Sequence, residues 1–251
     1  MKNIIIAAAA LLLLNIGSSL AQDQIIDVES FDKIIVSPHI QVTFVQGNQE
    51  SVTIEELLVE REKLNIVVKG NTLQLYLEGA KTVTKNEKVD DHNGNRKRPI
   101  YKGTIAKAIV TYKSIEKLSL RGEQKFVCES PLAMEKFDLA IYGESKVYLN
   151  EVNISKLNTK IYGESYLEIK KGSIQNQKIV AYGESKVDAM NVENQSIKIT
   201  AYGEGVFRFN VIKKLKVTSY GEATFQYTGN PDIQKGLMIG EASIEDINEK
   251  L

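Results

Sequence analysis

The chain of 251 residues carries 32 basic and 32 acidic side chains, so its formal net charge at pH 7 is zero. That balance argues against non-specific nucleic-acid binding, which needs an excess of basic residues to displace counterions. The single cysteine, Cys128, excludes an internal disulfide, and we expect it to fill an apolar position of the core.

Residues 1–21 have the pattern of a secretory signal peptide. Lys2 precedes an apolar run from Ile4 to Leu14, and Ser19-Leu20-Ala21 offers small residues to a signal peptidase. The run is short for a membrane span, and no later stretch is long and apolar enough to be one. We therefore expect residues 22–251 to be exported without a transmembrane segment, to the periplasm, the outer-membrane surface or the exterior.

Apolar and polar residues alternate between Phe31 and Gly79, which is typical of half-buried β-strands. Turn signals at Gly47-Asn48 and Gly70-Asn71 interrupt the alternation. The pattern predicts four short strands, whose apolar residues lie at 34–44, 52–54, 64–68 and 73–77.

A charged segment at about residues 81–103 breaks this pattern and contains hardly any apolar side chains. Its basic run Arg96-Lys97-Arg98 is too small to indicate a nucleic-acid site. We interpret the segment as a solvated loop inserted into a single domain of residues 22–251.

The tripeptide Tyr-Gly-Glu then recurs toward the C-terminus. Successive turn glycines, counting degenerate copies at Gly122 and Gly240, are 21, 20, 20, 20, 18 and 19 residues apart, the spacing of a stacked repeat. In most repeats apolar residues stand two and four positions before the glycine and four and six after it, with Val217 and Ser219 a weaker case. Because side chains alternate across a strand, each repeat should contain two short strands with one buried face.

A repeat of about 20 residues has no room for a helix in addition to its strands. We therefore predict an all-β fold, a right-handed, single-stranded parallel β-helix whose rungs lie about 4.8 Å apart. Counting the N-terminal strands as rungs gives about ten turns.

Three features of the chain resemble the auto-transporter adhesin head GIN domain family of secreted Bacteroidetes proteins. They are Phe31–Val36 with Gln41–Gly47, Gly70–Leu75, and the glycine-centred turns after Thr104. Members of that family typically show Gly-Ser-Gly-like steps where this chain has Tyr-Gly-Glu-Ser. The resemblance implies a β-helical, envelope-exported, adhesin-like protein, and it supplies no catalytic residues to carry over.

The repeated tyrosines share their strand parity with polar positions, so we expect them to point outward and to stack. We call this set the tyrosine ladder: Tyr142, Tyr162, Tyr182, Tyr202 and Tyr220. Such stacking stabilises a sheet by about 0.2–1 kcal/mol per pair. An exposed aromatic stripe can also bind a sugar or a protein. Both interpretations remain open.

The repeated glutamates form a second outward set, the glutamate column: Glu123, Glu144, Glu164, Glu184, Glu204, Glu222 and Glu241. Carboxylates about 5 Å apart repel by roughly 1 kcal/mol in water, so we expect something to offset this. Hydrogen bonds from turn amides of the next rung are the favoured explanation. Pairing with Lys125, Lys146 and Lys186, or binding of calcium, are the alternatives.

The only histidines, His39 and His92, form no recognisable triad or metal cluster with other residues. We predict a non-enzymatic cell-envelope protein, an adhesin-like or structural binding module without a cofactor. Its ligand would be a cell-surface glycan or an envelope protein, bound by the tyrosine ladder together with Glu144, Glu164, Glu184, Glu204 and Glu222.

A carbohydrate-active enzyme, either a polysaccharide lyase or a hydrolase on a β-helix, is the alternative hypothesis. It predicts a concave cleft whose carboxylates lie closer together than the ladder spacing. An envelope sensor or an assembly scaffold is a third possibility.

Overall fold

The computed structural model describes residues 24–91 and 94–250. In those ranges the regular structure is β-strand apart from two short 3-10 segments, Arg61–Lys63 and Asn248–Lys250. The all-β prediction is confirmed, whereas the predicted signal peptide at residues 1–21 lies outside the described residues. No helix in the described ranges is long and apolar enough to cross a membrane.

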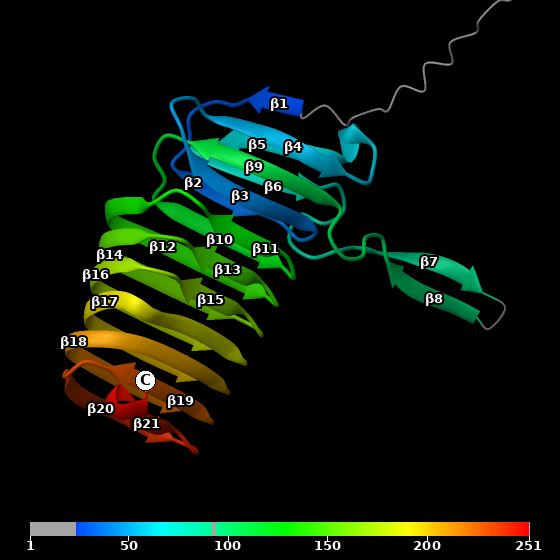
Figure 1. Cartoon of the computed structure of the whole chain (residues 1–251). Helices are drawn as coiled ribbons and strands as arrows, with labels where there is room; N and C mark the ends of the chain where they lie inside the picture. Colours follow the sequence, from blue (N-terminus) through cyan, green and yellow to red (C-terminus); the bar gives the residue numbers. More distant parts are fainter. Residues whose placement is uncertain (1–23, 92–93, 251) are drawn as a thin grey trace, which may run out of the picture.

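Parallel strands form a β-solenoid of about six turns with rungs of about 20 residues, as predicted (Figure 1). One series of strands precedes the turn glycines: β10 (Lys117–Gly122), β12 (Leu132–Gly143), β14 (Val152–Tyr162), β16 (Gly172–Tyr182), the ends of β17 (Ser185–Tyr202) and β18 (Gly205–Tyr220), and β20 (Asp232–Ile239). The other series follows them: β11 (Lys125–Cys128), β13 (Lys146–Leu149), β15 (Tyr166–Ile169), the beginnings of β17 and β18, β19 (Ala223–Thr228) and β21 (Ser243–Asp246).

Equivalent positions of successive rungs lie side by side, because the strands pair in parallel and in register. The apolar residues predicted to point inward are buried, and the Phe207 and Phe225 rings stack 5.2 Å apart. Half-buried exceptions are Tyr227 near the C-terminal end and Ile66 and Val68 in the N-terminal strands. Burial of a Val, Leu, Ile or Phe side chain contributes about 1.5–3 kcal/mol. The inward-facing apolar residues are therefore the main source of stability.

Each rung turns at its glycine, between the tyrosine and the glutamate. The turn glycines from Gly122 to Gly240 have φ between +93° and +137°, a region that residues with a Cβ rarely adopt. A Cβ on Gly143 would also overlap the carbonyl oxygen of Gly122 in the rung before it. The glycine is therefore required both by the turn and by the close approach of successive rungs.

The N-terminal strands close one end of the solenoid. Four of them continue the parallel stack: β2 (Lys33–Val36), β3 (Ile40–Gln46), β6 (Thr72–Leu77) and β9 (Ala106–Tyr112). Three others pair antiparallel with their neighbours: β1 (Gln24–Asp27), β4 (Ser51–Leu57) and β5 (Leu64–Lys69).

The antiparallel pairing reduces the number of coils. Gly70 and Asn71 have φ of 53° and 56°, as in a two-residue type I′ hairpin, and they fold β6 back on β5. The expected ten turns are therefore wrong, because β1, β4 and β5 cap the stack instead of adding rungs to it.

The segment predicted as a solvated loop contains a hairpin. Strands β7 (Asn86–Asp91) and β8 (Gly94–Pro99) form a separate antiparallel sheet that projects away from the solenoid (Figure 1). His39 joins the two ends of the insertion, since its Nδ1 lies 2.6 Å from the Gly103 carbonyl oxygen and its Nε2 lies 2.6 Å from Thr84 Oγ1.

Candidate functional site

The tyrosine ladder runs along the corner of the solenoid just before the turn glycines. Parallel register places each tyrosine beside its equivalent in the next rung, from Tyr142 to Tyr220. Neighbouring ring centroids are 4.7–5.1 Å apart, and the ring planes are tilted by only 3–6°. The stacking predicted from the repeat is confirmed.

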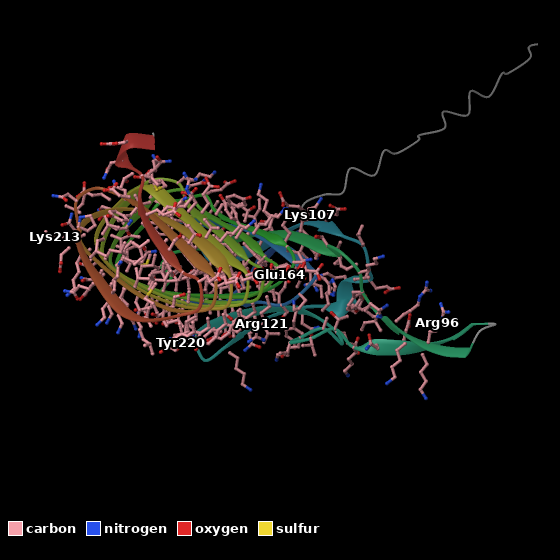
Figure 2. The ribbon with its side chains drawn as sticks, turned by 90° about the horizontal axis from the view of Figure 1, so that it is seen from below. Arg96, Lys107, Arg121, Glu164, Lys213 and Tyr220 are labelled. Atoms are coloured by element: carbon pink, nitrogen blue, oxygen red, sulfur yellow. The ribbon has the colours of Figure 1, made fainter. Side chains whose placement is uncertain are left out.

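Stacking limits what the ladder offers to a ligand. Tyr162 and Tyr182 are 36% and 39% exposed, because each has a neighbouring ring on both of its faces. The Arg121 guanidinium lies 5.5 Å from the Tyr142 centroid at the N-terminal end of the stack. Figure 2 shows Arg121 and Tyr220 along the same margin of the solenoid. The ladder therefore presents ring edges and a row of hydroxyl groups, each able to donate and to accept a hydrogen bond.

The glutamates on the far side of the turn glycines point into solvent. The five predicted site glutamates are all exposed, and their carboxylates form no hydrogen bond or ion pair with other described residues. The predicted hydrogen bonds from turn amides are therefore wrong. Pairing with Lys125, Lys146 and Lys186 is also wrong, and Lys125 lies instead 5.3 Å from the Tyr148 ring centroid.

The residue after the glutamate makes the polar contacts of the corner. Ser145, Ser165 and Ser185 are buried. Their Oγ atoms donate to glycine carbonyl oxygens of the preceding rung, at 2.8, 2.9 and 3.3 Å (acceptors Gly122, Gly143 and Gly163). Serine hydroxyls thus join successive rungs, and the glutamates remain free for other contacts.

A shallow depression of about 470 Å³ lies beside the glutamate column, lined by Glu164, Glu184, Glu204 and Glu222 among others. Its carboxylates follow the rung spacing, at which like charges repel by about 1 kcal/mol per pair in water. In the part of the chain that the structure describes, no group of three or more His, Cys, Asp or Glu side chains could hold a metal ion.

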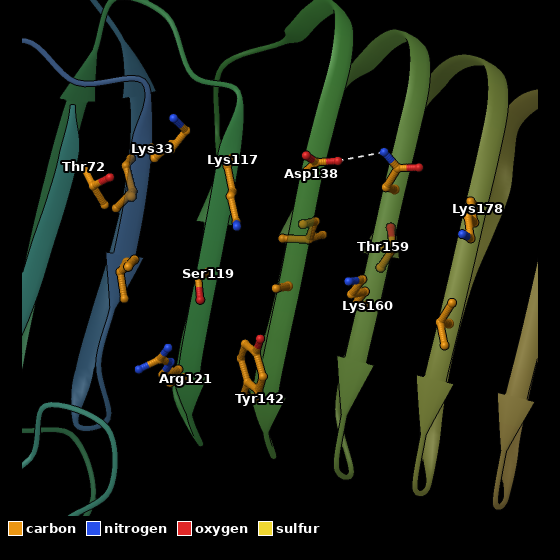
Figure 3. Close-up of a pocket in the computed structure, with 16 residues that line it drawn as sticks. Lys33, Thr72, Lys117, Ser119, Arg121, Asp138, Tyr142, Thr159, Lys160 and Lys178 are labelled. Atoms are coloured by element: carbon orange, nitrogen blue, oxygen red, sulfur yellow. Dashed lines mark hydrogen bonds between the residues drawn. The ribbon is translucent and has the colours of Figure 1, made fainter. Parts of the chain in front are cut away.

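A second hollow lies on the other side of the tyrosine ladder. We call it the basic groove, a depression of about 520 Å³ on the outer face of the sheet, across β2, β10, β12, β14 and β16 (Figure 3). Its charged lining is mostly basic: Lys33, Lys117, Arg121, Lys160 and Lys178. Tyr142 of the ladder stands at its edge.

Sequence reasoning missed the basic groove, although the repeat contained a signal for it. A lysine stands five residues before the turn glycine in five rungs. Lys235 pairs with Val217, whereas the other four share one register: Lys117, Lys178, Lys198 and Lys216. Parallel register places Lys178 beside Lys198 and Lys198 beside Lys216. We call these four lysines, with Lys33 beside Lys117, the lysine row.

The groove contains one carboxylate, Asp138, which is already engaged. It pairs with Lys136 at 3.1 Å and accepts a hydrogen bond from Asn158 Nδ2 at 2.7 Å. Burial alone would raise the pKa of Asp138, but these two contacts outweigh it and hold the pKa below its usual value. Asp138 is thus ionised at neutral pH and has no second carboxyl group in the groove.

The histidines and the cysteine are the remaining candidates for a reactive side chain, and His39 and Cys128 have structural roles. His39 holds the hairpin insertion, and the other histidine, His92, lies outside the described residues. Cys128 is 2% exposed, and burial raises the pKa of its thiol to about 12. The prediction that Cys128 fills the core is confirmed.

Comparison with known proteins agrees with this architecture. A family model described as "Putative auto-transporter adhesin, head GIN domain" matches residues 30–231. No curated protein matches the chain.

Several solved structures share the fold. A "putative adhesin" from Bacteroides fragilis NCTC 9343 has a TM-score of 0.72 at 19% identity, covering 90% of this chain and 96% of its own. A "putative adhesin" from Parabacteroides distasonis ATCC 8503 has a TM-score of 0.65 at 18% identity, covering 89% and 95%. A "putative lipid binding protein" from the same strain has a TM-score of 0.59 at 18% identity, covering 90% and 96%.

Proposed function

This chain belongs to the auto-transporter adhesin head GIN domain family, and on that premise we propose that it is a non-enzymatic, adhesin-like binding module of the cell envelope. Residues 22–251 would be its exported, single-domain part. The ligand is a cell-surface glycan or an envelope protein that lies along the tyrosine ladder and contacts the glutamates beside it.

The observation that carries the proposal is the continuity of the ladder. Five hydroxyl-bearing rings follow one another without a break at 4.7–5.1 Å. An extended ligand along the stack axis would meet the same donor and acceptor at every rung, with an exposed carboxylate on one side. Repetition of one contact gives affinity to a ligand that itself repeats or is extended.

A non-enzymatic role is also supported by the distribution of carboxylates. Glycoside hydrolysis generally requires two carboxyl groups held about 5–9.5 Å apart around one bond. The basic groove has only Asp138, already bound to Lys136 and Asn158. The glutamates repeat equally at every rung, whereas an active site would distinguish one pair from the others.

The proposal is tested by conservative variants of the ladder. Tyr182→Phe with Tyr202→Phe removes two hydroxyls and keeps the stacked rings, so the fold should be unchanged. The matched control is Tyr148→Phe, which lies outside the ladder on β13. Binding of residues 22–251 is measured on a glycan array and on isolated envelope fragments.

We expect the ladder variant to lose at least about tenfold in affinity, which corresponds to about 1.4 kcal/mol, while the control keeps its binding. Full binding by the ladder variant, or the absence of any ligand on the array and in the envelope fragments, would refute the proposal. Release of shortened glycan chains during the assay would establish the enzymatic alternative.

A further inference from the structure

Charges of opposite sign are separated by the tyrosine ladder. The lysine row precedes the ladder on the sheet face, and the glutamate column follows it beyond the turn glycines. Five basic residues and a single acidic one line the basic groove. A chain with zero formal net charge thus presents a distinctly basic face.

Most cations of this face form no ion pair within the part of the chain that the structure describes. Lys33 pairs with Asp32 at 3.4 Å. Five other lysines form no ion pair with another described residue: Lys117, Lys160, Lys178, Lys198 and Lys216.

The lysines at 178, 198 and 216 stand directly beside one another on neighbouring strands. Like charges at such cross-strand positions destabilise a sheet. No carboxylate among the described residues pairs with these three lysines, and a bound polyanion would offset their repulsion.

The groove has the direction and the chemistry for a linear polymer. It crosses successive strands, so a ligand along it meets a new rung about every 4.8 Å. A sugar unit of an extended glycan occupies a similar length. Hydroxyl and amide groups of Tyr142 and Asn158 lie among the cations and can bond sugar hydroxyls.

A membrane surface fits this site less well. A lipid bilayer is broad and binds best where apolar side chains can insert beside basic ones. The large apolar side chains that are exposed in the described chain, such as Ile25, Leu58 and Leu237, lie elsewhere, and none lines the groove.

We propose that the basic groove binds a linear acidic glycan, whose carboxylate or sulfate groups lie along the lysine row. This deepens the proposed function and rests on it for the kind of ligand. It also assigns the sides of the ladder: the acidic groups of the glycan lie on the lysine side, and its uncharged hydroxyl groups face the glutamates.

The test uses residues 22–251 and isothermal titration with three acidic oligosaccharides: oligogalacturonate, hyaluronan and chondroitin sulfate. Fully methyl-esterified oligogalacturonate is the uncharged control ligand. The groove variant is Lys160→Glu with Lys178→Glu, and the matched control is Lys146→Glu with Lys186→Glu. All four lysines are exposed, and the control pair lies beyond the turn glycines.

At least one acidic ligand should bind at least about tenfold more tightly than the ester. The groove variant should lose about tenfold or more of that affinity, and the control variant less than about twofold. Affinity should fall as salt is raised from about 50 to about 300 mM, because screening weakens contacts between exposed charges.

Four results would overturn the inference: no binding of the three acidic ligands, equal affinity for the acid and its ester, an unchanged groove variant, or preference for phosphatidylglycerol vesicles. Tyrosine-dependent binding of a neutral glycan or an envelope protein without these effects would leave the proposed function standing. Lysine-dependent acidic binding that survives Tyr182→Phe with Tyr202→Phe would instead refute the role of the ladder.

Discussion

Replacement of Gly163 by alanine should disrupt the corner of the solenoid. Gly163 has φ of +116°, in a region that is essentially restricted to glycine. An added Cβ would overlap the carbonyl oxygen of Gly143, the same atom that accepts the Ser165 hydroxyl at 2.9 Å. The obstructing atom belongs to the backbone, so no change of rotamer can relieve the overlap.

The expected cost is a sum of two effects. Backbone strain of this kind costs about 1–3 kcal/mol. Moving the two rungs apart would also weaken the hydrogen bond from Ser165, worth about 1 kcal/mol. A total of about 2–4 kcal/mol corresponds to a fall in Tm of about 4–16 °C for a chain of this size.

Gly70→Ala is the matched control. Gly70 also has a positive φ, +53°, but a Cβ there would meet nothing within 4 Å. Its cost should be limited to about 1–2 kcal/mol for the left-handed conformation. Tm is measured for both variants of residues 22–251 by circular dichroism. Equal losses would show that the contact between successive glycines does not constrain the corner, and the reasoning would fail.

Tyr182→Ala removes two ring contacts at 5.1 and 4.7 Å and should cost about 1–3 kcal/mol in denaturant unfolding, whereas Tyr182→Phe should stay close to the parent; equal costs would contradict a role for stacking. Cys128, whose thiol pKa is raised to about 12 by burial, should resist iodoacetamide in the native protein and react in concentrated guanidinium chloride; mass spectrometry detects the adduct, and rapid native labelling would contradict the burial. Asp138→Asn should lower Tm at pH 7, and the difference should shrink toward pH 3. The pKa of Asp138 is lowered in the folded state, so its contribution is present above the unfolded pKa and is lost as the pH falls through the folded pKa. A pH-independent difference would argue that the contacts of Asp138 do not depend on its charge.

The repeating part of the fold could be predicted because every rung has the same alternation of buried and exposed residues around its turn glycine. The positions of buried and exposed residues around Gly163 and Gly183 follow from strand alternation, and register then places the tyrosines in a stack. Stacking of equivalent residues needs no knowledge of distant contacts, since every neighbour is another copy of the same pattern.

The N-terminal cap and the β7–β8 hairpin lack this repeat, so they could not be predicted in the same way. Alternation is identical for parallel and antiparallel strands, so the capping role of β4 and β5 was hidden. Strands β7 and β8 have almost no apolar residues, and backbone pairing alone leaves no hydrophobic signal.

The candidate site was predicted in part for a similar reason. The tyrosine ladder repeats in every rung from Tyr142 to Tyr220 and is visible in the sequence. The lysine row is interrupted by Asp138 and Asn158, and one outward lysine per rung looks like an ordinary solvated residue. The glutamate contacts were predicted wrongly, because turn amides such as those of Gly163 and Gly183 already donate to backbone carbonyl oxygens of the neighbouring rung.

The two ends of the stack differ in how they would respond to tension. At the N-terminal end the antiparallel strands β1, β4 and β5 cap the stack, whereas at the C-terminal end β20 and β21 pair only with β18 and β19 in the described chain. Force between the termini should therefore detach the coils one after another from the C-terminal end. When one coil has detached, the force acts on the next. A coil of about 20 residues releases about 65–70 Å of extended chain. A single-molecule pulling record should show steps of that length, so that a molecule holding a ligand under shear would lengthen gradually before it failed.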